Sequence, residues 1–295
     1  QVLATRPDIF PPQWIAEFSR LQDQVPPVPF EELLPELEKI LGKSPFEAFL
    51  NLQREAAAGA SIAQVHLAEL QDGTPVVLKV RRPDIRPRID ADLRLLQHLG
   101  RLMESEIPEA RRFHPEKIIS QFSKSLNREL DLAMEGRNTD RFARNFKDNA
   151  DIVFARVHWE YTSESLLVME QIKGIPGNHI EQLRTEGYDL KLLAVRGADT
   201  ILKMVLMDGF FHADPHPGNV FYLPENRIAI IDCGMVGRIS VERRDQIADL
   251  LAALVAKDID ALRDILLVWA GDACIDEHKL GADVDELIFN YENVP

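Results

Sequence analysis

The sequence predicts an α+β fold of two lobes, a small lobe built on an antiparallel sheet and a mainly helical lobe, with a helical extension in front. This prediction depends on the changing period of the apolar residues. They follow a helical period at the start of the chain, an alternating strand period between residues 49 and 80, and a helical period again over most of the second half. A length of 295 residues is sufficient for one domain of this kind.

The composition is that of a globular protein, with 45% hydrophobic and 28% charged residues. The chain carries 34 Lys and Arg against 48 Asp and Glu, and the resulting net charge of −14 argues against a nucleic-acid-binding protein. Its two cysteines make no disulfide framework, so a reducing, cytosolic setting is expected. The longest apolar stretch, residues 247–256, is too short to span a membrane.

Residues 1–48 are expected to form the helical extension. Prolines divide this part into two helical segments, residues 13–24 and 30–41. The first segment repeats its apolar side chains at helical spacing: Trp14, Ile15, Phe18 and Leu21. A helix this short is marginal in water by itself, so we expect both segments to pack on the rest of the chain. They would lie either across the functional site or as a cap on the hydrophobic core.

Residues 49–172 are expected to form the small lobe. Alternating apolar residues at 62–67 and 76–80 predict two strands joined by a turn at Asp72-Gly73. Between residues 84 and 146 the helical period returns as an insertion, and two further strands are expected at 152–158 and 165–169.

Residues 173–295 are expected to form the helical lobe, and the boundary is placed near 171–177. Helices are predicted at 190–207, 243–256 and 261–269. Between the first and second of these, short apolar segments at 220–222 and 228–231 predict a small hairpin.

The sharpest chemical signal lies in Gly209-Phe-Phe-His-Ala-Asp214-Pro-His-Pro-Gly-Asn219. Asp214 and Asn219 are five residues apart, the spacing of the protein-kinase catalytic loop, in which the Asp meets the acceptor and the Asn holds a metal. Downstream, Asp232 follows an apolar strand and precedes Cys-Gly. Its carboxylate and the Asn219 amide are hard oxygen donors of the kind that magnesium prefers. The combination predicts a protein-kinase-like fold that binds ATP and Mg²⁺.

Upstream features are consistent with a phosphate site. Val76-Val-Leu-Lys79-Val places a lysine inside an apolar strand, where an unpaired ammonium would be costly to bury. We expect Lys79 to meet phosphates and a helix carboxylate; the alternative is an edge-strand lysine that faces solvent. Before it, Ala56-Ala-Ala-Gly-Ala-Ser61 is rich in small residues, which let backbone amides approach phosphates closely. A tightly packed turn is the alternative reading of that segment.

The carboxylate partner of Lys79 is expected in the segment from Asn127 to Asn138. Glu129 and Glu135 are acidic positions of what is predicted to be one helix. They are six residues apart, so they would lie on different faces and have two distinct roles. A charged helix at the surface is the alternative.

With these motifs together, the chain resembles the UbiB/ADCK (aarF) family of atypical protein-kinase-like proteins, and within it the bacterial UbiB branch of ubiquinone biosynthesis. The resemblance covers essentially the whole chain. Its specific segments are Ser61-Ile-Ala-Gln-Val-His66, Phe211-His-Ala-Asp-Pro-His-Pro-Gly-Asn219 and Glu129-x-Asp131. Asp232-Cys-Gly, where other members have Asp-Phe-Gly, is similar to the bacterial branch.

The resemblance implies a role for each site residue. The nucleotide would be held by an alanine-rich loop, a lysine and a residue at the end of the last small-lobe strand: Ala58, Gly59, Ala60, Ser61, Lys79 and Glu170. Catalysis would depend on Asp214 and on Lys79 paired with Glu135, while Asn219 and Asp232 would hold magnesium. Gln1, Glu129 and Asp131 would be regulatory. In the family, a Glu-x-Asp pair such as Glu129 and Asp131 contacts a helical extension that folds over the active site, and Gln1 belongs to the motif of that extension.

The resemblance also implies partners and a location. ATP and Mg²⁺ are the expected cofactors, and the expected partners are ubiquinone-biosynthesis enzymes and isoprenoid lipid precursors at the cytoplasmic side of the bacterial inner membrane. Three features depart from the family pattern. Gln1 stands where the family's Lys-x-Gly-Gln motif ends, so the lysine of that motif and the family's hydrophobic carboxy-terminal segments are not in this sequence. Gly59 stands where many members have alanine, which is expected to loosen the loop.

Two other functions remain open at this point. A zinc-dependent hydrolase is suggested by His212-x-Asp214-x-His216, because histidines two apart in a strand share a face. A non-catalytic module that binds lipids or partners under nucleotide control is the other. Bound zinc would indicate the hydrolase, and nucleotide binding without turnover would indicate the module.

Overall fold

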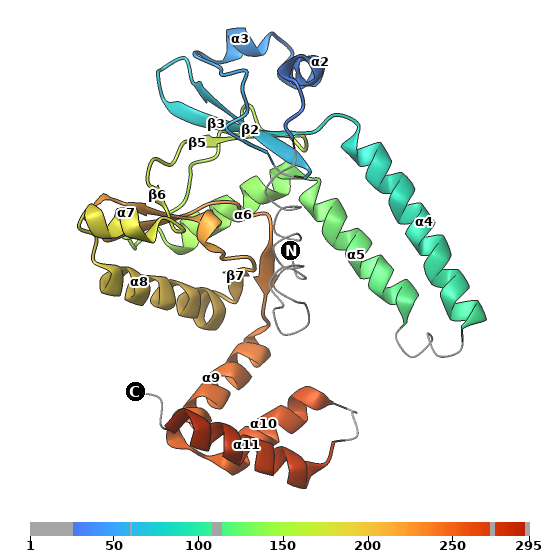
Figure 1. Cartoon of the computed structure of the whole chain (residues 1–295), viewed down its shortest axis with the longest axis vertical. Helices are drawn as coiled ribbons and strands as arrows, with labels where there is room; N and C mark the ends of the chain where they lie inside the picture. The colour runs from blue at the N-terminus through green and yellow to red at the C-terminus, as the bar shows by residue number, and fades with distance from the viewer. Residues whose placement is uncertain (1–25, 60, 108–113, 272–274, 293–295) are drawn as a thin grey trace. The chain divides into compact units, whose positions relative to one another are not determined.

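The structure is a computed structural model that describes residues 26–59, 61–107, 114–271 and 275–292 (Figure 1). It is mixed α+β, as predicted. Its contacts divide the chain into two units, Gln1–Leu190 with Asp214–Met235, and Lys191–Ala213 with Val236–Pro295. The division into residues 1–48, 49–172 and 173–295 that was expected from the sequence stays a prediction.

The first unit is built on an antiparallel sheet with the strand order β1-β2-β3-β5. The strands are β1 (Ala58–Gly59), β2 (Ala63–Glu69), β3 (Pro75–Arg81) and β5 (Leu166–Glu170). The predicted hairpin is confirmed, and β2 pairs with β3 in a register that places Val65 opposite Lys79. Gly73 in its turn has φ +84°, a conformation that glycine adopts without steric cost.

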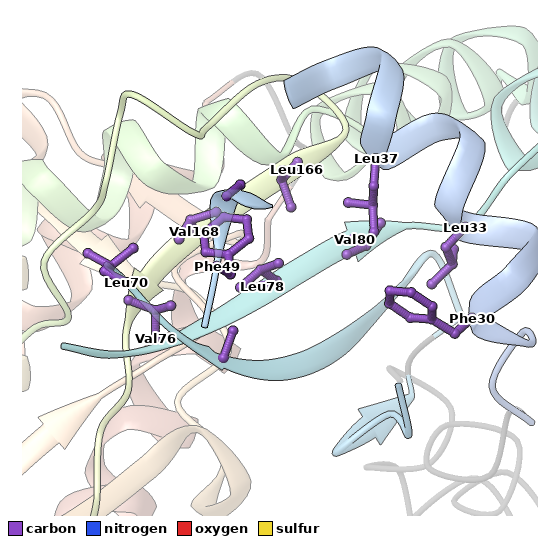
Figure 2. Packing of buried hydrophobic residues seen from close by; sticks show 12 residues of the cluster. Phe30, Leu33, Leu37, Phe49, Leu70, Val76, Leu78, Val80, Leu166 and Val168 are labelled. Carbon is purple, nitrogen blue, oxygen red and sulfur yellow. The ribbon is translucent and has the colours of Figure 1, made fainter. Parts of the chain in front are cut away.

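Two short helices, α2 (Phe30–Leu41) and α3 (Pro45–Ala48), cover one face of this sheet (Figure 2). Phe30, Leu33 and Leu37 lie on one side of α2 and are buried against β3 and β5. The full cluster comprises Phe30, Leu33, Leu37, Ala48, Phe49, Ala68, Leu70, Val76, Leu78, Val80, Leu166 and Val168. Of the two alternatives for the segment 30–41, the structure therefore shows the core cap. The segment 13–24 lies outside the described residues.

A buried polar clamp fixes the chain where it enters α2. The Gln64 amide accepts from the backbone N–H of Val28 at 2.8 Å and donates to the Val28 carbonyl at 3.0 Å. His66 lies 3.0 Å from the same amide nitrogen and 3.0 Å from the Gln53 carbonyl. Its Nδ1 therefore carries the proton and its Nε2 accepts from Gln64. Gln64 and His66, two residues of the motif 61–66, thus have a structural role as hydrogen-bonding partners of the chain before α2.

The insertion forms three helices, α4 (Ile85–Glu106), α5 (Pro115–Glu129) and α6 (Leu132–Asn145). Figure 1 shows α4 and α5 side by side, and α6 running from the end of α5. The expectation of one helix through Glu129 and Glu135 was wrong, because α5 ends at Glu129 and α6 begins at Leu132. Asp131 caps the new helix, since its Oδ1 accepts from the N–H of Met134 at 3.2 Å.

A second sheet of the first unit has the order β4-β9-β8-β6. Its strands are β4 (Ile152–Val153), β6 (Ile175–Pro176), β8 (Val220–Leu223) and β9 (Arg227–Ile230), with α7 (Ile180–Thr185) following β6. The predicted hairpin at 220–231 is confirmed. The strand predicted at 152–158 is shorter than expected, and only an isolated bridge between Val157 and Met169 continues it.

The second unit contains α8 (Leu190–Leu202), a π-helical turn (Lys203–Asp208), β7 (Phe210–His212) paired with β10 (Val236–Arg238), and the helices α9 (Val241–Ala256), α10 (Ile259–Ala270) and α11 (Glu277–Glu292). Ser240 and Asp258 cap α9 and α10, since each side chain accepts from a backbone N–H of the first turn. The last helix was not predicted. Among the residues that the structure describes, no helix is both long and apolar enough to cross a bilayer.

Candidate nucleotide and metal site

Lys79 lies at the centre of the candidate site. It projects from β3, and its Nζ is 2.9 and 2.8 Å from the two carboxylate oxygens of Glu135 in α6. The same Nζ is 3.1 Å from Oδ1 of Asp232. The expected contact between Lys79 and Glu135 is present although 56 residues separate them in the sequence. The contact is possible because α6 packs against β5, where a Cβ on Gly136 would lie 3.1 Å from Leu167, and Leu167 pairs with Lys79 of β3.

Burial and charge oppose each other at this cluster. The side chain of Glu135 is 5% exposed and that of Lys79 is 16% exposed. Burial by itself would lower the pKa of Lys79, but the carboxylates of Glu135 and Asp232 outweigh it and hold that pKa above its ordinary value. Burial raises the pKa of Glu135, against the effect of Lys79. We assign both groups as ionised at neutral pH, because one ammonium donates to both carboxylate oxygens at short distance.

Asp232 begins a tight loop directly after β9. Its φ of +54° is in the left-handed region, which Asp enters more readily than most residues. Cys233 points inward and is fully buried, and burial raises the pKa of its thiol to about 12, so it is protonated and unreactive at neutral pH. Gly234 leaves room beside the carboxylate, because a Cβ there would lie 3.3 Å from Oδ1 of Asp232. The Asp232 side chain itself is 47% exposed.

The β8–β9 hairpin brings the second oxygen donor to the same place. Val220 pairs with Ile230, and the N–H of Ile231 donates to the carbonyl of Asn219 at 2.9 Å. Asn219 therefore lies beside the residue that precedes Asp232. Its side-chain nitrogen donates to the backbone carbonyl of Asp214 at 3.2 Å. With the nitrogen committed to this loop, the amide oxygen is the end that can face a cation.

These donors fit a magnesium ion in a nucleotide complex. Asn219 and Asp232 offer an amide oxygen and a half-exposed carboxylate, both hard ligands, and phosphate oxygens would complete an octahedral set. Among the residues that the structure describes, no group of three or more His, Cys, Asp or Glu could hold a metal ion by itself. The zinc site suggested by His212-x-Asp214-x-His216 is therefore not supported. His216 instead accepts a hydrogen bond from the N–H of Gly218 through its Nδ1, at 3.1 Å.

Glu129 and Asp131 differ in their surroundings. Burial raises the pKa of Glu129, and the carboxylates of Asp232 and Asp214 contribute in the same direction, against the effect of Lys79. Asp131 caps α6 and its Oδ2 is 3.0 Å from Nη2 of Arg137. The structure gives Asp131 a helix-capping role, and the regulatory role of both residues stays a prediction.

The remaining predicted residues lie along the sheet. Ala58 and Gly59 form β1, where Gly59 pairs with Gln64, and Ser61 is exposed in the bend that follows. Glu170 is exposed at the end of β5, opposite Val76 of β3. Gln1 and Ala60 lie outside the described residues. The nucleotide contacts of this group stay predictions.

Two residues of the site were missed from the sequence. Asn138, one turn of α6 beyond Glu135, donates through its side chain to the carbonyl of Cys233 at 2.9 Å. Arg81, two residues beyond Lys79 on β3, donates to the carbonyl of Leu130 at 2.8 Å and so fixes the junction between α5 and α6. The spacing of Asn138 from Glu135 places both on one helix face, which was the available signal.

Comparison with known proteins decides the family. A family model described as the ABC1 atypical kinase-like domain matches residues 20–266. The chain belongs to this ABC1 family. The matched range contains Lys79, Glu135 and the loops with Asp214, Asn219 and Asp232, and the resemblance inferred from the motifs is confirmed.

Curated relatives of this ABC1 chain carry the name "Probable protein kinase UbiB". The chain is 41% identical over 263 residues to the one from Vibrio atlanticus (strain LGP32), a match that covers 88% of this chain and 48% of that protein. It is 42% identical over 263 residues to the one from Aliivibrio fischeri (strain ATCC 700601 / ES114), with the same coverage. It is 40% identical over 262 residues to the one from Pseudomonas aeruginosa (strain LESB58), covering 88% and 49%. The chain thus spans about half the length of these relatives.

A solved structure supports the ABC1 fold. The chain is similar to Rv3197 from Mycobacterium tuberculosis, which was solved in complex with erythromycin, with a TM-score of 0.69 and 21% sequence identity. The match covers 98% of this chain and 72% of the other. At this identity the likeness concerns the kinase-like fold alone.

Proposed function

We propose that this chain is the nucleotide-binding part of an atypical kinase-like ATPase that supports ubiquinone biosynthesis, with Mg²⁺-dependent chemistry on ATP. The observation that carries the proposal is the buried ammonium of Lys79, held between Glu135 and Asp232. A lysine fixed in this way beside the Asp214 and Asn219 loop is the arrangement by which kinase-like proteins bind phosphates.

Each residue has a part that follows from its position. Lys79 is oriented by Glu135 and presents its positive charge to the phosphates, and Asp214 orients the attacking hydroxyl or water and accepts its proton. Asn219 and Asp232 would hold Mg²⁺, which neutralises the charge that develops on the phosphate oxygens. The residues 58–61 would cover the phosphates with backbone amides. Glu170 would contact the nucleotide from the end of β5.

ATP hydrolysis coupled to a lipid or an enzyme complex is the activity that family membership favours over phosphorylation of other proteins. The partners would be ubiquinone-biosynthesis enzymes and isoprenoid lipid precursors at the cytoplasmic side of the bacterial inner membrane. Glu129 has a place in this proposal, because the charges of Asp232, Lys79 and Asp214 all influence its pKa. An element that binds Glu129 would restrict access of a bulky acceptor to Asp214.

Phosphate release from MgATP tests the proposal. We expect turnover by the wild type that increases when a lipid head-group mimic or detergent is added. Asp214→Asn should lower turnover by about 10²–10⁴-fold, because the amide cannot accept a proton, while MgATP binding remains. Asp249→Asn, an exposed carboxylate of α9, is the matched control and should leave turnover unchanged. Turnover by Asp214→Asn equal to that of the wild type would contradict the assignment. Binding without any turnover in the wild type would indicate the non-catalytic module.

A further inference from the structure

Asn138 is a buried polar residue to which the proposed chemistry gives no role. It lies in α6 three residues beyond Glu135, and both side chains are 5% exposed. Its Nδ2 donates to the carbonyl of Cys233 at 2.9 Å, a bond that joins residues 95 positions apart. The next residue, Thr139, donates to the carbonyl of Glu135 at 2.9 Å. One face of α6 therefore contacts both Lys79, through Glu135, and the loop that begins at Asp232.

The Asp232 loop needs such support. Asp232 is held with φ +54°, and a residue keeps a sparsely populated backbone conformation only where its surroundings fix it. The Cys233 carbonyl that accepts from Asn138 is one residue further along. The loop also passes close to α6, since a Cβ on Gly234 would lie 3.3 Å from Oδ1 of Asp232 and 3.7 Å from Oε2 of Glu135. A buried hydrogen bond from α6 thus holds the backbone carbonyl next to Asp232.

We propose that Asn138 is a positioning residue for the metal ligand Asp232. Through the Cys233 carbonyl it fixes the loop so that the Asp232 carboxylate is presented for a divalent cation, while Glu135 from the same helix fixes Lys79. The single helix α6 thereby positions both Lys79 and the Asp232 loop. This inference rests on the proposed function, because it assumes that Asp232 binds Mg²⁺ with the nucleotide.

A buried hydrogen bond also stabilises a fold, so the test has to separate stability from metal affinity. Asn138→Ala leaves the Cys233 carbonyl without its donor and removes no residue of the proposed catalytic machinery. Phe142→Leu is the matched control, since Phe142 is fully buried in the same helix and its ring stacks on Phe154 at 5.3 Å. Both substitutions should lower the melting temperature. Only Asn138→Ala should alter the dependence on Mg²⁺.

The experiment measures ATP binding by the whole chain at increasing Mg²⁺ concentrations. We expect Asn138→Ala to raise the Mg²⁺ midpoint about tenfold, as the loss of groups that orient metal ligands commonly does. Phe142→Leu should stay within about twofold of the wild type. Asn138→Ser, which keeps a shorter donor, should lie between the two and is used if the alanine variant does not fold.

Two results would overturn the inference, and they can be told apart. A midpoint for Asn138→Ala or Asn138→Ser equal to that of Phe142→Leu would show that Asn138 only stabilises the fold, with the proposed function intact. If the wild type binds ATP with no dependence on Mg²⁺, the proposed function fails and the inference fails with it.

Discussion

The contact between Lys79 and Glu135 can be tested by removing one charge and then both. Lys79→Met leaves the Glu135 carboxylate, 5% exposed, without its ammonium partner. Breaking a buried ion pair by removing one partner costs about 3–5 kcal/mol. Because Lys79 is 16% exposed, we expect the lower end, about 3 kcal/mol of unfolding free energy.

Removing both charges should restore much of that stability. In Lys79→Met/Glu135→Leu no buried charge remains, and apolar side chains of similar volume take the place of the pair. Replacing a buried pair in this way is often neutral, so the double variant should be about 2 kcal/mol more stable than Lys79→Met. The exposed pair Arg184 and Glu181, at 3.1 Å, is the control, and its coupling should be under about 1 kcal/mol.

The pH dependence gives a second signature. In Lys79→Met, burial still raises the pKa of Glu135 and the ammonium no longer opposes it. A carboxyl whose pKa is higher in the folded state contributes stability at low pH and loses that contribution as the pH rises through the folded value. The destabilisation of Lys79→Met relative to the wild type should therefore be smaller at about pH 5.5 than at about pH 7.5.

Urea unfolding of the wild type, both single variants and the double variant provides all four free energies. If the double variant is as unstable as the sum of the single changes, the two side chains do not interact and the arrangement of the site is wrong. A Lys79→Met variant whose deficit grows as the pH falls would also contradict the reasoning.

Three further outcomes are expected. Burial lowers the pKa of His66, and its Nε2 accepts from Gln64, so the wild type should lose stability as the pH falls below the ordinary histidine value of 6.5; thermal melts of His66→Asn should show a smaller loss. Gly174→Ala should destabilise by about 1–3 kcal/mol, because its Cβ would meet the Tyr222 carbonyl at 2.7 Å. Gly281→Ala in α11, with nothing within 4 Å, should be neutral or stabilise by about 0.5–1 kcal/mol, and the opposite order in urea melts would refute the packing argument. Deleting residues 1–25 should keep ATP binding, since the hydrogen bonds between Gln64 and Val28 remain. It should also increase access of peptide acceptors if the extension lies across the functional site, and unfolding of the deletion variant would show that the segment is structural.

The hairpins and the catalytic spacing could be predicted from the sequence because each depends on short-range patterns. Alternating apolar residues around Asp72-Gly73 specify a strand, a turn and a strand whatever lies elsewhere. The partner of Lys79 was also predictable in kind, since an ammonium inside an apolar strand requires a carboxylate. The spacing of Asp214 and Asn219 along one loop is likewise a short-range pattern, and their catalytic and metal-binding roles stay predictions.

Other features depend on contacts that no local pattern records. The helical period runs through residues 127–135 without a glycine or proline, so the break between α5 and α6 was not visible. It forms where Asp131 caps α6 and Arg81 donates to the Leu130 carbonyl. Asn138 donates a hydrogen bond to the Cys233 carbonyl, 95 residues away, a contact that no local sequence pattern indicates. The apolar face of α2 had two plausible partners, and only the packing on β3 and β5 distinguished them.

Calorimetric binding of ATP with and without Mg²⁺, by the wild type and by Asp232→Asn, tests the central claim most directly. The Asp232 carboxylate is half-exposed and contributes little to the core, and in the proposed function it binds the metal. We therefore expect wild-type binding that requires Mg²⁺, and an Asp232→Asn variant that melts close to the wild type without ligand but has lost the Mg²⁺-dependent binding. Binding of MgATP by Asp232→Asn as tight as by the wild type would contradict the account.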